Sequence, residues 1–204
     1  MPLGQLDSTP IVRVNHKTGR FESAKATAAS ISGRVMAIHY GRKKFTQDGA
    51  GKWSLECVSQ DCRHGDANNG DTIQCMGSAW CRDCKSTLAL AMSAGERKVL
   101  ILETSASVAT TIRDRLAPVI SRGVAMDAVV LKLHLGVSSS ARMTFAQCSV
   151  ELTDTASALT ACPPPSPERL DILLGDFADY IRSSFAMRTP QTSRTDLSGA
   201  ELSV

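Results

Sequence analysis

The stretch SISGRVMAIHYGRKKF, residues 30–45, alternates two sets of side chains along its length. The odd-numbered residues from Val35 to His39 fall on one side of an extended chain, and the even-numbered residues from Met36 to Tyr40 fall on the other. A period of two is typical of a β-strand, whereas a helix repeats its faces every three to four residues. We therefore predict a strand over this stretch.

Similar patterns continue toward the C-terminus. A helix is predicted where apolar residues recur with helical spacing, in SASVATTIRDRLAPVISRG. Five strands with a helix between the third and fourth is the order of an OB fold. We expect a mainly β fold with helices, organised as an OB-like five-stranded barrel; a split-sheet α+β domain has the same element order and stays open as an alternative. After the opening strand, the predicted strands are KWSLECV (52–58), RKVLILET (97–104), DAVVLKLHLGV (127–137) and RMTFAQCSVEL (142–152).

The composition restricts the class of protein. Hydrophobic residues make up 43% of the 204-residue chain but aromatic residues only 4%, so the core must be aliphatic. Residues 1–55 carry nine Lys and Arg against three Asp and Glu, which indicates an anionic partner for this part. No apolar run reaches the length of a membrane span, and the start of the chain lacks the pattern of a signal peptide. We expect a cytoplasmic protein of a bacterial or phage-infected cell, without membrane contact.

Five cysteines lie within residues 57–84. In a reducing compartment such a cluster points to a metal before disulfides. Cys81 and Cys84 form a C-x-x-C turn, which suits two ligands of a tetrahedral structural Zn²⁺. Cys57 and Cys75 are the preferred remaining pair. The alternate ligands are Cys62 and His64.

In the segment GRKKF, residues 41–45, three consecutive cations lie between Tyr40, which precedes the segment, and Phe45. Lys52-Trp53 follows on the next predicted strand. Cations that hold phosphates, interleaved with rings that stack on unpaired bases, are typical of proteins that bind single strands. We predict a loop here that binds nucleic acid. The predicted contacts are Arg34, Tyr40, Arg42, Lys43, Lys44, Phe45, Lys52 and Trp53.

Motifs for catalysis are absent from the sequence. It contains no phosphate-binding loop, nucleophile elbow, HExxH metalloprotease motif or dinucleotide fingerprint. His64 lacks the glutamate two positions later that a zinc deaminase requires. We therefore predict that the protein is not an enzyme; a reactive cysteine is the one enzymatic alternative.

The domain organisation follows from changes in composition. The proline-rich ACPPPSP ends in Ser166-Pro167, a pair that suits the cap and first residue of a helix. We predict an N-terminal strand or arm (1–28), a barrel (29–155) with a zinc insertion (57–85), a proline-rich linker (156–166), an amphipathic C-terminal helix (167–188) and a disordered tail (189–204).

Taken together, PIVRVNHKTGRF, CVSQDCRHG and the later Cys-Trp-Cys-x-x-Cys run resemble zinc-containing proteins of phages and mobile elements. The resemblance is to a group of OB-fold type related to single-stranded-DNA-binding proteins, and covers roughly residues 10–105. It picks out Cys57, Ser59, Asp61, Cys75, Cys81 and Cys84. It implies a zinc-bearing domain that binds single strands, while the extra Cys62 and His64 depart from its pattern.

These observations favour a non-catalytic protein that binds single-stranded DNA or RNA, carries structural Zn²⁺, and acts in replication or recombination of phage or mobile-element DNA. The C-terminal helix is expected to dock on a protein partner, a second protomer or its own barrel. The alternative is a zinc-containing adaptor subunit of a larger nucleoprotein complex, such as a CRISPR-type effector or a replication assembly.

Overall fold

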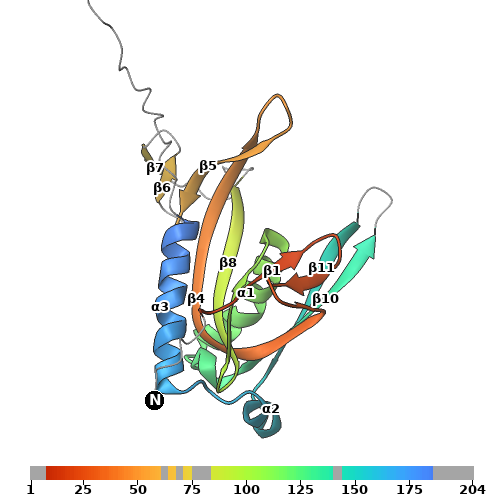
Figure 1. Cartoon of the computed structure of the whole chain (residues 1–204), viewed down its shortest axis with the longest axis vertical. Helices are drawn as coiled ribbons and strands as arrows, with labels where there is room; N and C mark the ends of the chain where they lie inside the picture. The colour runs from red at the N-terminus through yellow and green to blue at the C-terminus, as the bar shows by residue number, and fades with distance from the viewer. Residues whose placement is uncertain (1–7, 61–63, 68–70, 75–83, 140–143, 186–204) are drawn as a thin grey trace, which may run out of the picture.

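The computed structural model describes residues 8–60, 64–67, 71–74, 84–139 and 144–185. Most of them lie in strands of one continuous sheet, and helices lie against its faces (Figure 1). The main path of the sheet has the order β3-β2-β1-β9-β8-β4-β5-β6-β7, and β11 joins through β10, which pairs with β4. The expected mainly β class is confirmed. The strands are β1 (Ile11–Asn15), β2 (Arg20–Glu22), β3 (Thr27–Ala28), β4 (Ser30–Gln47), β5 (Trp53–Ser59), β6 (His64–Ala67), β7 (Thr72–Gln74), β8 (Cys84–Gly95), β9 (Lys98–Glu103), β10 (Val130–Ser139) and β11 (Thr144–Thr153); the helices are α1 (Ala106–Ser121), the short η1 (Met126–Ala128), α2 (Ala156–Ala161) and α3 (Pro167–Ser184).

Strand β4 connects the parts of the sheet, because it pairs with three neighbours along its 18 residues. Its first residues, 30–34, pair with β10, and its last, 42–47, pair with β5 on the same edge. The opposite edge pairs with β8 over residues 34–44. The strand bends strongly between these parts (Figure 1), which brings β10 and β11 over the face of β8 and β9.

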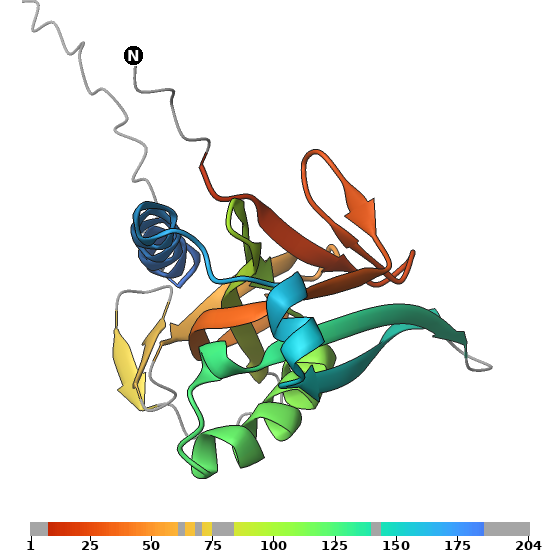
Figure 2. The ribbon, with the colours of Figure 1, turned by 90° about the horizontal axis from the view of Figure 1, so that it is seen from below.

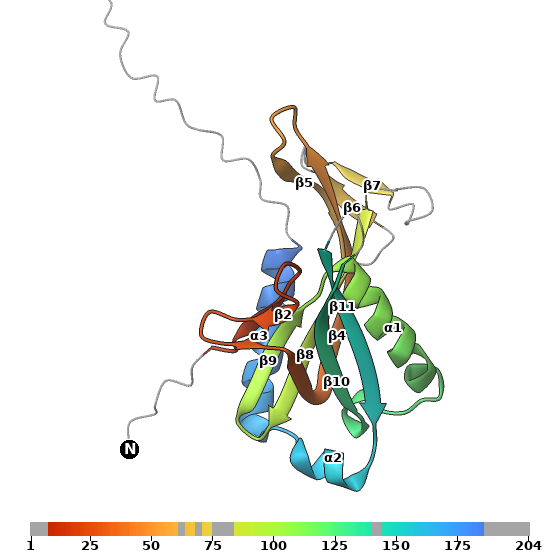
Figure 3. The same ribbon diagram turned by 90° about the vertical axis from the view of Figure 1, so that its right-hand side faces the viewer.

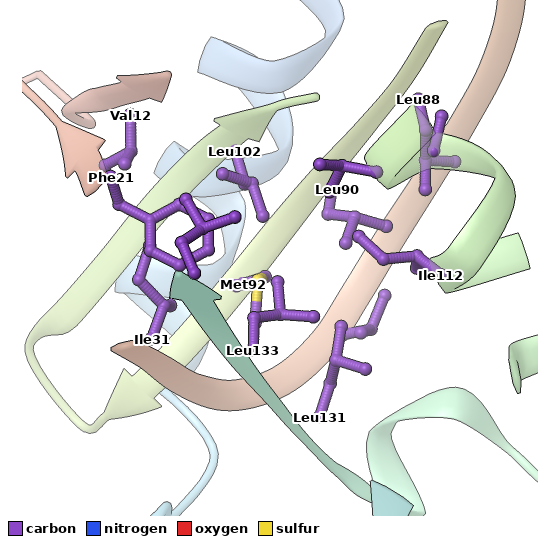
Figure 4. Packing of buried hydrophobic residues seen from close by; sticks show 14 of the residues in the cluster. Val12, Phe21, Ile31, Leu88, Leu90, Met92, Leu102, Ile112, Leu131 and Leu133 are labelled. Carbon is purple, nitrogen blue, oxygen red and sulfur yellow. The ribbon is translucent and has the colours of Figure 1, made fainter. Parts of the chain in front are cut away.

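The bend encloses one apolar core. Leu90, Met92 and Leu102 are fully buried and face Leu131 and Leu133 from β10 (Figure 4). Helix α1 covers the open side and buries Val108, Ile112 and Leu116 in the same cluster. Among the described residues the sheet nevertheless ends at β3, β7 and β11, so the closed OB barrel is not confirmed.

Helix α3 covers the opposite face of the sheet (Figures 2 and 3). It buries Leu173, Phe177 and Tyr180 against small residues of β8, Ala89 and Ala91. The predicted cap is confirmed, since the Ser166 side chain accepts a hydrogen bond from the Arg169 amide at 3.3 Å. The helix ends at Ser184, and the predicted tail at 189–204 lies outside the described residues.

Strand β8 was missing from the predicted element order. The strand is buried on both faces, with Leu88 and Leu90 toward the α1 core and Ala89 and Ala91 toward α3. A strand of this kind shows no alternation of polar and apolar residues, and the sequence pattern alone does not separate it from a buried helix.

Other segments also differ from the expected layout. The predicted zinc insertion, 57–85, contains β6 and β7. The N-terminal hairpin belongs to the sheet, because β1 pairs in parallel with β9. The predicted linker contains α2. None of the described helices combines the length and apolarity needed to cross a membrane.

Candidate nucleic-acid interface

The predicted basic loop is part of a strand, the distal half of β4 (residues 39–47). Together with β5, this half forms a ribbon that projects past the ends of α1 and α3 (Figures 1 and 3). Because side chains alternate along a strand, the consecutive cations are divided between its two faces. Tyr40, Arg42 and Lys44 lie on the face that packs against α1, here called the α1 face. Lys43 lies on the α3 face.

On the α3 face, the Lys43 side chain is mostly buried, and a carboxylate compensates its charge. Its side chain is only 12% exposed, and its Nζ lies 3.9 Å from Glu103 Oε1 on β9. The same Nζ lies 4.6 Å from the ring centroid of Phe185, just after α3. Burial lowers the pKa of Lys43, and the Glu103 carboxylate opposes that shift. Arg13 binds the other oxygen of Glu103 at 2.7 Å.

Phe185 can occupy this position because residue 41 is glycine. A Cβ atom at Gly41 would lie 2.4 Å from Phe185 Cε1 and 2.8 Å from the Ser59 carbonyl oxygen. The ring also meets His39 edge-on at a centroid distance of 4.8 Å. Burial, and then the charge of Lys43, lowers the pKa of His39. The α3 face of distal β4 is therefore a packed anchor for the end of α3.

The α1 face has a different character. The Tyr40 hydroxyl donates to Ser86 Oγ on β8 at 2.8 Å. Arg113 on α1 donates from Nη1 to the Tyr40 oxygen at 3.5 Å. Lys44 binds Glu56 at 2.7 Å and keeps 26% of its side chain exposed. The Nε and Nη1 atoms of Arg42 are buried and have no hydrogen-bond partner among the described residues.

The other predicted nucleic-acid contacts lie apart from this face. The Arg34 guanidinium donates to three carbonyl oxygens, those of Asp127, Leu159 and Cys162, and so joins β4 to η1 and the end of α2. Phe45 is 38% exposed near the tip of the ribbon, where Lys52 is also exposed. The backbone of Trp53 pairs with Gln47.

The predicted zinc ligands are described only in part. Cys62, Cys75 and Cys81 lie outside the described residues. Cys57 on β5 and Cys84 on β8 both pair with Lys44, one on each edge of β4. Their Cα atoms are therefore separated by two strand spacings, about 10 Å. Among the described residues, no three His, Cys, Asp or Glu side chains form a group that could hold a metal.

Two further observations bear on the cysteines and His64. Cys57 pairs with Ala67, so His64, three residues before Ala67, lies on the other face of that ladder. Burial raises the pKa of the Cys148 thiol to about 11, which keeps it protonated and unreactive at neutral pH.

Sequence reasoning missed the residues that other elements bring to distal β4. These are Ser86, Glu103, Arg113 and Phe185, from β8, β9, α1 and the end of α3. Only Gly41 gave a local signal, since a glycine within a strand indicates close approach of another group. In comparisons with known proteins, no family model, curated protein or solved structure matches the chain.

Proposed function

We propose that the protein is a non-catalytic binder of single-stranded nucleic acid, and that the α1 face of distal β4 makes the contact. The observation that carries the proposal is the stripe of Tyr40, Arg42 and Lys44 on the α1 face of β4, at the base of the ribbon that β4 forms with β5. The ribbon offers cations for phosphates and few aromatic rings for bases. Binding therefore depends mainly on charge and decreases steeply with salt.

The proposal includes a structural Zn²⁺ held by the cysteine cluster of residues 57–84, with Cys57 on β5 as its ligand among the side chains that the structure describes. Tetrahedral thiolate sites stabilise folds whose loops have little core of their own. The full chain is expected to contain about one zinc per molecule, measured by mass spectrometry of the purified protein. Cys57→Ser should lower this content, whereas Cys162→Ser, a buried thiol beside α2, should leave it unchanged; equal zinc in both variants, or none in the parent, would contradict the site.

The binding proposal is tested by fluorescence anisotropy of labelled DNA and RNA, single- and double-stranded, across a series of salt concentrations. Single strands should bind more tightly than duplexes, and the logarithm of affinity should fall linearly with the logarithm of salt concentration. Lys44→Ala should weaken binding, and Lys25→Ala, an exposed cation in the turn between β2 and β3, serves as the matched control. Absence of binding at low salt would overturn the proposal.

A second candidate function, a protein adaptor within a nucleoprotein complex, is favoured by strand β11. It pairs with β10 over ten residues without a register shift, and no other described strand pairs with it. Its sequence TFAQCSVELT has no proline or lysine, the usual protections of an edge. Beside it lies a groove of about 450 Å³, whose charged lining is Asp114, Arg115, Arg122 and Glu151 and whose apolar lining includes Val150 and Leu152.

An edge of this kind accepts an added strand, and the apolar side chains in the groove favour an extended partner segment that carries apolar residues. Val150→Pro would remove a backbone donor and block such an addition. If this variant lost a partner in co-purification while the parent showed no affinity for oligonucleotides, the adaptor function would replace the first proposal.

A further inference from the structure

Arg42 differs from the other cations of β4 in how its charge is compensated. Arg34 donates to three carbonyl oxygens, Lys43 lies against Glu103, and Lys44 binds Glu56. Nε and Nη1 of Arg42 are removed from solvent and donate to nothing in the described part of the chain. A guanidinium is charged at every accessible pH, so it cannot reduce this cost by losing a proton. The residue as a whole is half-buried and Nη2 is not one of these buried atoms, so an anion at this guanidinium would compensate a charge that two of its donors leave unpaired.

The surroundings of Arg42 supply further donors for an anion. Ser86 pairs directly with Arg42 across the β4–β8 ladder, so the two side chains share the α1 face at neighbouring positions. Ser86 Oγ accepts its hydrogen bond from Tyr40, which leaves the serine hydroxyl hydrogen available to donate. Arg113 brings a second guanidinium to the same tyrosine from α1.

The local carboxylates do not compensate Arg42. Asp114 is bound by its neighbour Arg113, through Nε at 3.0 Å and Nη2 at 2.8 Å. Glu56 is bound by Lys44, and Glu103 lies on the opposite face with Lys43 and Arg13. The surroundings of Arg42 on this side therefore combine two guanidinium groups and two hydroxyls with two carboxylates, Asp114 and Glu56, that are each already paired.

We propose that Arg42 and Ser86, supported by Tyr40 and Arg113, form a binding site for one phosphate group. The fork of a guanidinium matches two oxygens of a phosphate, and the serine hydroxyl donates to a third acceptor position. Resting on the proposed function, this inference assigns the phosphate to the backbone of a bound single strand. Arg42 and Ser86 then fix where the backbone crosses β4 and β8, and Tyr40 and Arg113 act as positioning residues.

The first experiment measures the thermal midpoint of the full, zinc-replete chain against increasing inorganic phosphate, with sodium chloride at matched ionic strength as the reference. A ligand that binds only the folded state raises the midpoint in proportion to the logarithm of its concentration. The wild type should show this rise. Arg42→Met should lose it, and Arg97→Met, an exposed arginine in the turn between β8 and β9, should keep it.

The same series shows whether Arg42 is structural. Arg42→Met removes an uncompensated charge and keeps an apolar stem of similar length, so its midpoint without phosphate should equal or exceed that of the wild type. Ser86→Ala should fold normally and weaken the response to phosphate. The inference is overturned if phosphate adds nothing beyond chloride, or if Arg42→Met responds as the wild type does.

A second arm separates free phosphate from a nucleic-acid backbone. Oligonucleotides with neutral methylphosphonate linkages should bind less tightly than normal ones, and Arg42→Met should reduce the slope of log affinity against log salt by about 0.7. Protection by phosphate without any affinity for oligonucleotides would retain the anion site but reject its assignment to a strand. Oligonucleotide binding without protection by phosphate would reject the anion site alone.

Discussion

Arg42 and Lys43 are neighbours in the sequence, but they lie on opposite faces of β4 and have opposite environments. Lys43 is enclosed by Glu103 and Phe185 and holds the end of α3 against the sheet. Arg42 has buried donors without a described acceptor. The comparison shows that adjacent cations in a basic motif can have separate roles, one in stability and one in binding. Each face can be tested with variants that leave the other intact.

The largest effect is expected from the anchor on the α3 face. Phe185→Ala would leave a cavity between His39 and Lys43 and should lower the free energy of unfolding by about 3–5 kcal/mol. Chemical denaturation of the variant and the wild type measures this difference. As a control, Leu174→Ala on the exposed side of α3 should cost much less. Equal losses in the two variants would mean that Phe185 is not an anchor.

The next effect separates the two arginines of β4. Arg34→Met leaves three carbonyl oxygens without their hydrogen-bond donor and should lower the free energy of unfolding by about 2–3 kcal/mol. Arg42→Met leaves no described acceptor without its donor, so the free energy of unfolding should not fall. Denaturation curves of both variants under one set of conditions make the comparison. A loss for Arg42→Met as large as that for Arg34→Met would show that Arg42 also has a structural role.

A smaller effect concerns the two lysines and affinity for single strands. Lys44→Ala on the α1 face should reduce the salt slope by about 0.7, the contribution of one phosphate contact. Lys43→Ala should leave the slope unchanged, since that side chain is only 12% exposed and lies on the α3 face. Anisotropy titrations of both variants measure the slopes. Equal reductions would mean that strand alternation does not divide the binding surface.

The smallest effect is a dependence of stability on pH through His39. Burial lowers the pKa of His39 in the folded state below its ordinary value of 6.5. The unfolded chain therefore binds more protons as pH falls through 6.5, and stability should decrease there until the folded pKa is passed. Denaturation midpoints of the wild type and His39→Gln between pH 5 and 8 test this. The variant should lose part of the pH dependence, whereas His16→Gln, an exposed control, should not.

Local patterns in the sequence predicted several elements well. The strand that begins at Ser30, helix α1 and the Ser166 cap all depend on residues close together in the chain. Strand β8 was missed because both its faces are buried, so its apolar residues do not alternate with polar ones. The closed barrel was expected from the order of five strands, and that order changes once β8 enters the sheet between β9 and β4.

By itself, the sequence determined that a strand begins at Ser30 and that cations gather at 42–44, which it placed in a loop. The structure continues the strand through these cations, and alternation then puts Arg42 and Lys43 on opposite sides. Only the tertiary structure decided which of them is neutralised. Glu103, Phe185, Ser86 and Arg113 reach β4 from distant parts of the chain. Charge compensation depends on these contacts through space, and no local pattern encodes them.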